Sequence, residues 1–311
     1  MKKFVTLVFA VLLSLGYAYS QEEEKPKAKD KPVSEPFGSG VLIDNQTSQM
    51  PVAKTLEMFI QHRFGTMANG IKDIYGIYSS ANIRMGFNYS LRDNLLVGYG
   101  LTRTNMYSDF QVKWNVLQQT RKNTIPVFVT LYGNMAIDGR NKSVFEGAGE
   151  DSTYSFNNRL AYIGQLIVGR KFCDWFSFQA AISFTHFNKV NEIKDHDVVG
   201  LGFTGRIKFS PQSAILFQYD MPLKIKSISE HIGFEKPSLP NFGIGYEVAT
   251  ATHAFQIFIA TVWALYRNMF ICITIIRLII QMALLITTGL MVFLHYGLAL
   301  PLHGFGVFKN P

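Results

Sequence analysis

Between residues 82 and 100 the chain alternates apolar and polar side chains at every second position. The apolar face carries Ile83, Met85, Phe87, Tyr89 and Leu91. The face between them carries Asn82, Arg84, Gly86, Asn88 and Ser90. Successive side chains of a β-strand point to opposite faces, so this pattern predicts a strand with one apolar and one polar face. The polar triplet at 92–94 precedes a second such segment, which predicts a hairpin.

The same alternation recurs from about Val52 to Thr261. The clearest further segments lie at 107–117, 174–186, 199–209, 213–221 and 241–248. Weaker segments lie at 54–63, 95–103, 124–134, 158–169 and 252–261. Each is close to the roughly nine to eleven residues that a tilted strand needs to cross a bilayer. In total, about eleven strands can be identified from the pattern.

The apolar face is the bulkier of the two on most segments. It carries Phe, Tyr, Trp and Leu, whereas the other face carries Gly, Asn and charged residues. A small soluble barrel fills its interior with bulky apolar side chains, whereas an outer-membrane barrel turns them toward lipid and its polar face inward. We therefore predict an all-β fold, an antiparallel transmembrane β-barrel. Because such barrels have an even strand number, about twelve strands are expected.

The connections between the predicted strands alternate in length. Short ones fall near 92–94, 117–123, 170–173, 210–212 and 249–251. The others fall near 64–81, 104–106, 136–157, 187–196 and 221–240, and all but 104–106 are long. Outer-membrane barrels have short periplasmic turns and longer outer loops, so the alternation supports this fold independently of the strand pattern.

The N-terminal region has two parts of different character. Lys2 and Lys3, an apolar run and Ala18-Tyr19-Ser20 predict a cleaved signal peptide over residues 1–20 and therefore export. Residues 21–36 are charged and proline-bearing, with no large apolar side chains to offset the entropy of ordering. We predict a periplasmic linker over 21–50, and the barrel over 51–261.

Residues 262–311 break the pattern. The stretch 269–302 is apolar, with only Arg277, Gln281 and His295 as interruptions, and shows no alternation. Three interpretations stay open: a helical membrane segment, an irregular final strand pair, and the product of a shifted reading frame near Val262. The length of the stretch satisfies the requirement for a membrane helix, and its Ile and Leu content disfavours a strand pair.

The composition of the chain limits the partners and cofactors that can be expected. Of 311 residues 48% are hydrophobic and 17% are charged, which excludes disorder throughout. The net charge of +8 is scattered along the chain, so a nucleic-acid partner is not expected. Cys173 and Cys272 form no metal-binding or haem-attachment motif. We therefore expect no cofactor and no metal; the expected partners are outer-membrane lipid and small solutes.

Ten charged or amide residues share the predicted interior face. They are Glu57, Gln61, Arg63, Arg84, Asp109, Lys113, Arg206, Lys208, Gln218 and Glu247. They could form a charged constriction that selects solutes, or an inward network of ion pairs that fills a narrow barrel. Both interpretations stay open. The glycine pairs Gly98/Gly100 and Gly243/Gly245 are predicted to relieve crowding on this wall.

Two outer loops carry further features. Asp195-His196-Asp197, with His186 nearby, could suggest an omptin-like acid/His site or a metal site, but no partner constellation accompanies it. We assign no catalytic residue. The loop "FGTMANGIKDIYGIYSS" at 64–80 has apolar residues at helical spacing. It could fold inward as a small plug or lie on the rim of the barrel.

Four stretches carry a resemblance to a known family. They are "LIDNQT" at 42–47, "IQHRFG" at 60–65, "GIKDIYGIYSSANIRMGFNYSLRDNLLVGYG" at 70–100 and "THAFQIFIA" at 252–260. Over residues 37–261 the chain resembles an uncharacterised Bacteroidetes-type outer-membrane β-barrel family, a family of domains of unknown function. The resemblance implies a barrel in the outer membrane and implies no reaction. Residues 262–311 depart from the family's pattern.

The function predicted from these patterns is porin-like passage of small solutes through an outer-membrane barrel, or service as a structural scaffold. The alternatives are an outer-membrane enzyme with a site at the rim or in the lumen, and a non-conducting binding barrel.

Overall fold

The computed structural model describes residues 30–146, 154–190, 195–229, 240–250, 252–261 and 269–281. The predicted signal peptide lies outside the described residues, as do residues 21–29 of the predicted linker, 262–268 and 282–311.

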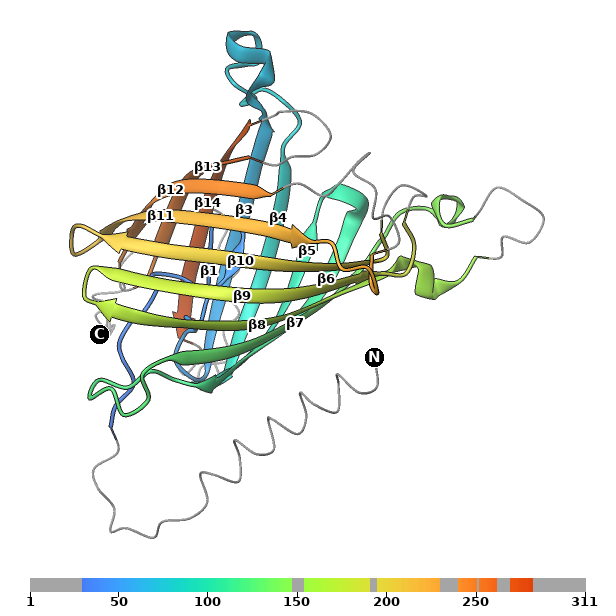
Figure 1. Ribbon diagram of the computed structural model, residues 1–311. Helices are drawn as coiled ribbons and strands as arrows, with labels where there is room; N and C mark the ends of the chain where they lie inside the picture. The colour runs from blue at the N-terminus through green and yellow to red at the C-terminus, as the bar shows by residue number, and fades with distance from the viewer. Residues whose placement is uncertain are drawn as a thin grey trace, which may run out of the picture.

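Twelve antiparallel strands form a closed barrel (Figure 1). They are β3 (Thr55–Thr66), β4 (Asn82–Arg92), β5 (Leu95–Thr102), β6 (Tyr107–Leu117), β7 (Phe128–Ile137), β8 (Leu160–Cys173), β9 (Phe176–Phe187), β10 (Asp197–Lys208), β11 (Ser213–Leu223), β12 (Asn241–Ala249), β13 (Ala254–Thr261) and β14 (Met269–Gln281). Each strand pairs with the next along the chain, and β14 pairs with β3 to close the ring. The all-β antiparallel fold predicted from the alternation is confirmed.

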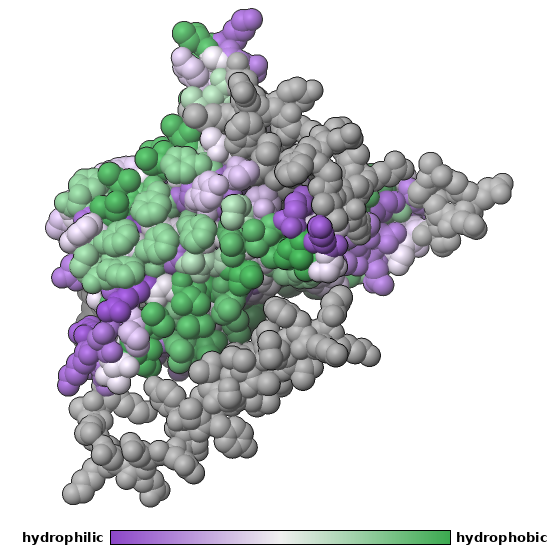
Figure 2. Space-filling model, in the orientation of Figure 1, coloured by the Kyte–Doolittle hydropathy of each residue, from purple (hydrophilic) through white to green (hydrophobic). Residues whose placement is uncertain are grey.

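The strand register keeps like faces together. Asn88 on β4 lies opposite Glu57 on β3 and Gly98 on β5, whereas its neighbour Phe87 lies opposite Met58 and Tyr99. The polar positions therefore form a continuous inner wall. The apolar positions form the outside, where Phe110, Val112 and Trp114 of β6 are each more than 40% exposed. Figure 2 shows apolar side chains gathered over the wall of the barrel.

The assignment of the outer face to lipid predicts the effect of one substitution. Val112 lies at the middle of β6 and is 45% exposed. Val112→Arg is expected to lower the free energy of unfolding in lipid vesicles by about 2–4 kcal/mol, because a charge at the bilayer midplane is poorly solvated. Val144→Arg, in an outer loop at the same 45% exposure, is the matched control and should have an effect within about 0.5 kcal/mol. Urea titrations that show equal losses for both variants would place this surface outside the bilayer.

Residues 269–281 form a strand, β14, so the helix left open for this stretch is wrong here. β14 pairs with β13 without interruption and with β3 across two register shifts. Membrane strands must satisfy their backbone groups within the sheet, so the free edges of β3 and β13 favour a strand whatever the alternation of its side chains. The barrel thus extends past residue 261. Among the described residues, no helix is long and apolar enough to span a membrane. The shifted reading frame stays a prediction.

The two ends of the barrel differ as predicted. Connections of two to four residues join β4 to β5, β8 to β9, β10 to β11 and β12 to β13, and a connection of ten residues joins β6 to β7 at the same end. We call this the short-turn end. The opposite, outer end carries the longer loops, with the short 3-10 helices η1 (Met67–Asp73), η2 (Thr104–Met106), η3 (Lys142–Val144) and η4 (Phe156–Arg159).

The apolar loop around η1 projects away from the barrel (Figure 1). Ile71 is 80% exposed and Tyr78 is 75% exposed. Hydrogen bonds from the Asn69 side chain and the Gly76 backbone to Asp73 order the loop and hold the pKa of that carboxyl below its usual value. Of the two positions left open for this loop, the inward plug is wrong, because the loop makes its own turn contacts outside the lumen.

The interior of the barrel is occupied by a different segment. Residues 37–50, which we call the plug segment, run inside the barrel as a small hairpin formed by β1 (Val41–Leu42) and β2 (Asn45–Gln46) (Figure 1). Phe37, Leu42 and Ile43 are at most 1% exposed. The linker predicted over 21–50 is therefore wrong for residues 37–50, because their apolar side chains find partners on the inner wall.

Candidate functional site

The plug segment enters and leaves the lumen at the short-turn end. Just before it, the Val33 N–H donates to the Gln119 carbonyl at 2.8 Å, in the turn between β6 and β7. Just after it, the Lys54 N–H donates to the Ser90 carbonyl near the end of β4 at 2.7 Å. The hairpin between these points reverses at Ile43-Asp44. The segment is therefore one continuous loop inserted from one mouth of the barrel.

The tip of the hairpin has a strained backbone. Ile43 has φ 57, in the left-handed region that a β-branched residue rarely adopts. Its N–H donates to Gln256 Oε1 on β13 at 3.1 Å, and the side chain is completely buried. On the facing wall, a Cβ added at Gly243 would lie 3.2 Å from Ile43 Cγ2. The wall thus imposes the turn, and Gly243 leaves the space that the tip occupies.

Apolar contacts hold the sides of the plug segment. Phe37, Leu42 and Ile43 form one buried cluster with side chains of the inner wall. The wall side chains of this cluster include Phe128, Tyr132, Ile167, Leu216 and Phe258. The rings of Phe37 and Phe128 meet edge to face, with centroids 6.0 Å apart. Full burial of such a side chain stabilises by about 1.5–3 kcal/mol. At this level the lumen is a packed core.

The plug backbone is hydrogen-bonded by wall side chains. Lys113 Nζ donates to the Gly40 carbonyl at 2.8 Å, Gln179 Nε2 to the Gln46 carbonyl at 2.6 Å, and Asn115 Nδ2 to the Ser48 carbonyl at 2.9 Å. Gln218 Oε1 accepts from the Asp44 N–H at 2.8 Å. These hydrogen bonds satisfy backbone groups of the plug that are shut off from water. The polar side chains of the wall are therefore matched to the backbone of the plug segment.

Two buried ion pairs lie on the wall itself. Arg84 Nε donates to Asp109 Oδ2 at 3.0 Å, and Asn134 donates to the same carboxylate at 2.8 Å. Gly100 makes room for this pair, since a Cβ there would lie 2.2 Å from Asp109 Oδ2. Arg206 Nε donates to Glu247 Oε1 at 2.7 Å. Gln256, the residue that binds the plug tip, donates to the other Glu247 oxygen at 2.9 Å.

All ten residues predicted to line the lumen lie on the inner face. Besides those in the wall pairs, Gln61 accepts from Arg84 at 3.3 Å, and Glu57 accepts from Asn88 at 2.9 Å. Arg63 forms an ion pair with Asp44 of the plug. Lys208 is half-buried near the short-turn end, on the face shared with Arg206. The geometry matches the inward network more closely than an open charged constriction.

The structure adds functional residues that the strand pattern did not identify. Gln179, Gln256 and Asn115 bind the plug, and Asn45 and Thr47 belong to it. A signal for the plug was present: the apolar run Val41-Leu42-Ile43 is out of place in a solvated linker, and the family resemblance begins at residue 37.

The acidic and histidine residues near the outer end do not converge on one point. Lys224 forms an ion pair with Asp195, while Asp197 Oδ1 lies 2.6 Å from His186 Nδ1. His186 Nε2 lies 3.1 Å from Asn188 Oδ1. Within the described ranges, no group of three or more His, Cys, Asp and Glu side chains could hold a metal ion. These side chains therefore form two separate pairs, Lys224 with Asp195 and His186 with Asp197.

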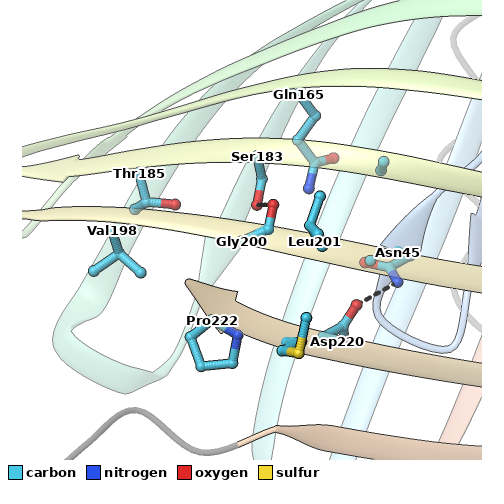
Figure 3. Close-up of a pocket in the computed structure, with 12 residues that line it drawn as sticks. Asn45, Gln165, Ser183, Thr185, Val198, Gly200, Leu201, Asp220 and Pro222 are labelled. Carbon is cyan, nitrogen blue, oxygen red and sulfur yellow. Dashed lines mark hydrogen bonds between the residues drawn. The ribbon is translucent and has the colours of Figure 1, made fainter. Parts of the chain in front are cut away.

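Two cavities lie on opposite sides of the plug segment. One, of about 220 Å³, lies toward the outer end, between the plug residue Asn45 and the walls of β8 to β11 (Figure 3). The other, of about 300 Å³, lies at the short-turn end and is lined by Pro36, Ser48, Met50 and Asn115, among others. We call these the outer cavity and the inner cavity. The plug segment separates them along the barrel.

Comparisons with known proteins give one matching family and several similar solved structures. No curated protein matches the chain. The outer membrane channel COG4313 from Pseudomonas putida F1 is similar over 75% of this chain and 97% of that chain, with 11% identity and a TM-score of 0.46. The NanC porin is similar over 71% of this chain and 98% of that chain, with 8% identity and a TM-score of 0.48. The sequence profile of the family described as membrane bound beta barrel domain (DUF5777) matches residues 37–275, and the chain belongs to that family.

Proposed function

We propose that the protein is an outer-membrane channel for small polar solutes and that the plug segment closes it in the conformation described here. The observation that carries this proposal is the position of the plug segment between two cavities inside one barrel. A barrel that served only as a wall-forming scaffold would have no need for a cavity on each side of a removable segment.

The inner wall supports a solute that is polar and carries little net charge. Five of its charged side chains lie in ion pairs: Arg84 with Asp109, Arg206 with Glu247, and Arg63 with Asp44 of the plug. Rings of unpaired charge of one sign are what give a pore strong ion selectivity. Hydrogen-bonding side chains such as Gln111, Gln179 and Gln218 remain the main chemistry of the wall.

The path of the plug segment supports its removal. The segment enters and leaves by the same mouth, so it can withdraw toward the periplasm without threading through the barrel. Withdrawal would join the outer and inner cavities. Its buried hydrogen bonds, each worth about 0.5–1.5 kcal/mol, and its apolar contacts oppose withdrawal, so the closed state should dominate at rest.

Gln256→Leu tests the proposal. Gln256 accepts from the Ile43 N–H and donates to Ser39 Oγ and the Val41 carbonyl, so the substitution removes contacts to the first arm and the tip of the hairpin. In single-channel recordings on planar bilayers, we expect the natural chain to open rarely and the variant to be open about tenfold more of the time.

The matched control is Gln111→Leu. Gln111 is a buried glutamine of the inner wall whose hydrogen bonds go to Asn88 and Tyr132 and not to the plug. This variant should open as rarely as the natural chain. If the two variants open equally often, the plug segment does not control passage.

A non-conducting barrel is the second candidate, and the apolar cluster around Phe37 favours it. In that case the plug is a permanent core. It predicts no openings in the natural chain and none in Gln256→Leu.

A further inference from the structure

The outer cavity has a lining suited to one kind of solute. Its polar side chains come from the plug and from three wall strands, β8, β9 and β11: Asn45, Gln165, Ser183, Thr185 and Asp220. Figure 3 shows the Gln165 amide and the Ser183 hydroxyl pointing into the same space, with Asn45 and Asp220 on its other side. Groups from separate elements thus converge on a volume of about 220 Å³, which is smaller than the roughly 300–1,000 Å³ of a typical drug-sized site.

Part of the lining is committed to the protein, and part is free for a solute. Asp220 accepts from Asn45 at 2.7 Å and from Asn241 at 3.4 Å, and it also accepts from Gln218. Asn45 donates to Thr204 as well, at 3.0 Å. Within the described part of the chain, the side chains of Gln165 and Thr185 have no hydrogen-bond partner. The Ser183 hydroxyl donates to the Gly200 carbonyl at 3.4 Å and keeps its oxygen lone pairs as acceptors, so it lines the cavity together with these two groups.

The charge of the lining excludes one class of solute. Among the twelve described lining residues there is one carboxylate and no lysine or arginine. An anion would face Asp220 without a compensating cation, which makes its transfer from water costly. The Asp220 carboxylate in turn accepts hydrogen bonds from three amide groups, so most of its hydrogen-bonding capacity is already used within the protein.

Two glycines of β10, Gly200 and Gly202, also line the outer cavity. A Cβ added at Gly200 would lie 3.0 Å from Ser183 Oγ, and one added at Gly202 would lie 2.9 Å from Asp220 Oδ1. Both glycines face inward on β10, where a side chain would crowd the two polar groups and take up the space between them.

We propose that the outer cavity binds a small, neutral, polyhydroxylated solute, of monosaccharide size, held by Gln165, Ser183 and Thr185 from the wall and by Asn45 from the plug segment. The proposal rests on the proposed function, since it names the solute class that the channel would take. Hydroxyl groups can both donate and accept, as amide and hydroxyl side chains require, and they add no charge to a site that already holds a carboxylate.

Saturation-transfer NMR on the full chain in detergent micelles tests the site without requiring passage. The probes are myo-inositol, choline as a cation of similar size, and gluconate as an anion. We expect inositol to bind and gluconate not to bind. The double variant Gln165→Ala/Thr185→Val removes two free hydrogen-bonding groups and should weaken inositol binding about tenfold. Ser177→Ala, on the same face of β9 but outside the cavity lining, should leave it unchanged.

Asp220→Asn separates specific from nonspecific binding, because only binding at this site should change its charge preference when the carboxylate is removed. The asparagine keeps an oxygen that can accept from Asn45 but removes the charge, so gluconate should now bind while inositol binding persists. Tighter binding of choline than of inositol to the natural chain would overturn the solute class. Inositol binding that is equal in the double variant and in Ser177→Ala would overturn the site. Neither outcome affects the conductance expected for Gln256→Leu. The solute site can therefore be wrong while the gated channel is right, and the two experiments tell these cases apart.

Discussion

Removal of the plug segment is expected to turn a barrel that is closed most of the time into one that is open permanently. Pro36 and Pro51 line the same inner cavity, so residues 37–50 can be replaced by a short Gly/Ser linker that joins these two points. If the closed state is favoured by about 3 kcal/mol, the mean conductance per barrel should rise on the order of a hundredfold. Planar-bilayer recordings and the swelling of solute-loaded liposomes both measure this change.

The deletion also exposes the wall side chains Leu216 and Phe258, which could loosen the barrel. Heat-modifiable migration on a gel shows whether the barrel is intact. A folded deletion variant that conducts no more than the natural chain would contradict the closing role of the plug.

A reversible tether provides the opposite test in a chain that keeps its plug. A Cβ at position 243 would lie 3.2 Å from Ile43 Cγ2, so we choose positions 43 and 243 for a pair of cysteines, in a background where Cys173 and Cys272 are alanine. Oxidation should abolish the rare openings, and reduction should restore them. The control is the same background without the two new cysteines. Its frequency of opening should be the same under oxidising and reducing conditions.

The second large effect concerns the buried pair of Arg206 and Glu247, whose side chains are 9% and 0% exposed. Glu247→Ala leaves the guanidinium buried without its carboxylate, and such a loss costs about 3–5 kcal/mol. The free energy of unfolding in lipid vesicles should fall by that amount. Because Gln256 also donates to Glu247 and holds the plug tip, the variant should open more often than the natural chain.

The double variant Arg206→Met/Glu247→Leu separates the two effects. Replacement of both partners by apolar side chains of similar volume removes the unpaired charge and should recover most of the lost stability. The more frequent openings should persist, since Gln256 still lacks its acceptor. If Glu247→Ala unfolds no more easily than the natural chain, the pair is not a structural element of the wall.

The barrel wall was predictable because its physics is local. A membrane strand has lipid on one side and the lumen on the other, so apolar and polar residues must alternate along it. In β6 the residues that face lipid are Phe110, Val112 and Trp114, and those that face inward are Asp109, Gln111 and Lys113. The ten lumen candidates followed from that alternation. Their partners did not, because pairing depends on register between strands, as for Arg84 and Asp109.

The plug and the closing strand were not predictable in the same way. The plug segment has only a few apolar residues and a charged neighbour, and most of its hydrogen-bonding partners on the wall lie more than 60 residues away, as Lys113 does from Gly40. β14 lacks the alternation entirely, and its conformation follows from the free edges of β3 and β13. The conformations of the plug segment and of β14 both depend on contacts with the rest of the barrel. A short stretch of sequence carries no information about those distant contacts.

That dependence bears on how the protein is made. Because both ends of the plug segment stay at one mouth, the twelve-stranded ring can be assembled and inserted in the membrane with residues 37–50 still outside it. The hairpin would then dock last, into a cylinder whose shape is complete. The left-handed Ile43 tip, with its N–H on Gln256, fits only that finished cylinder, so docking of the hairpin would report correct assembly of the strands around it.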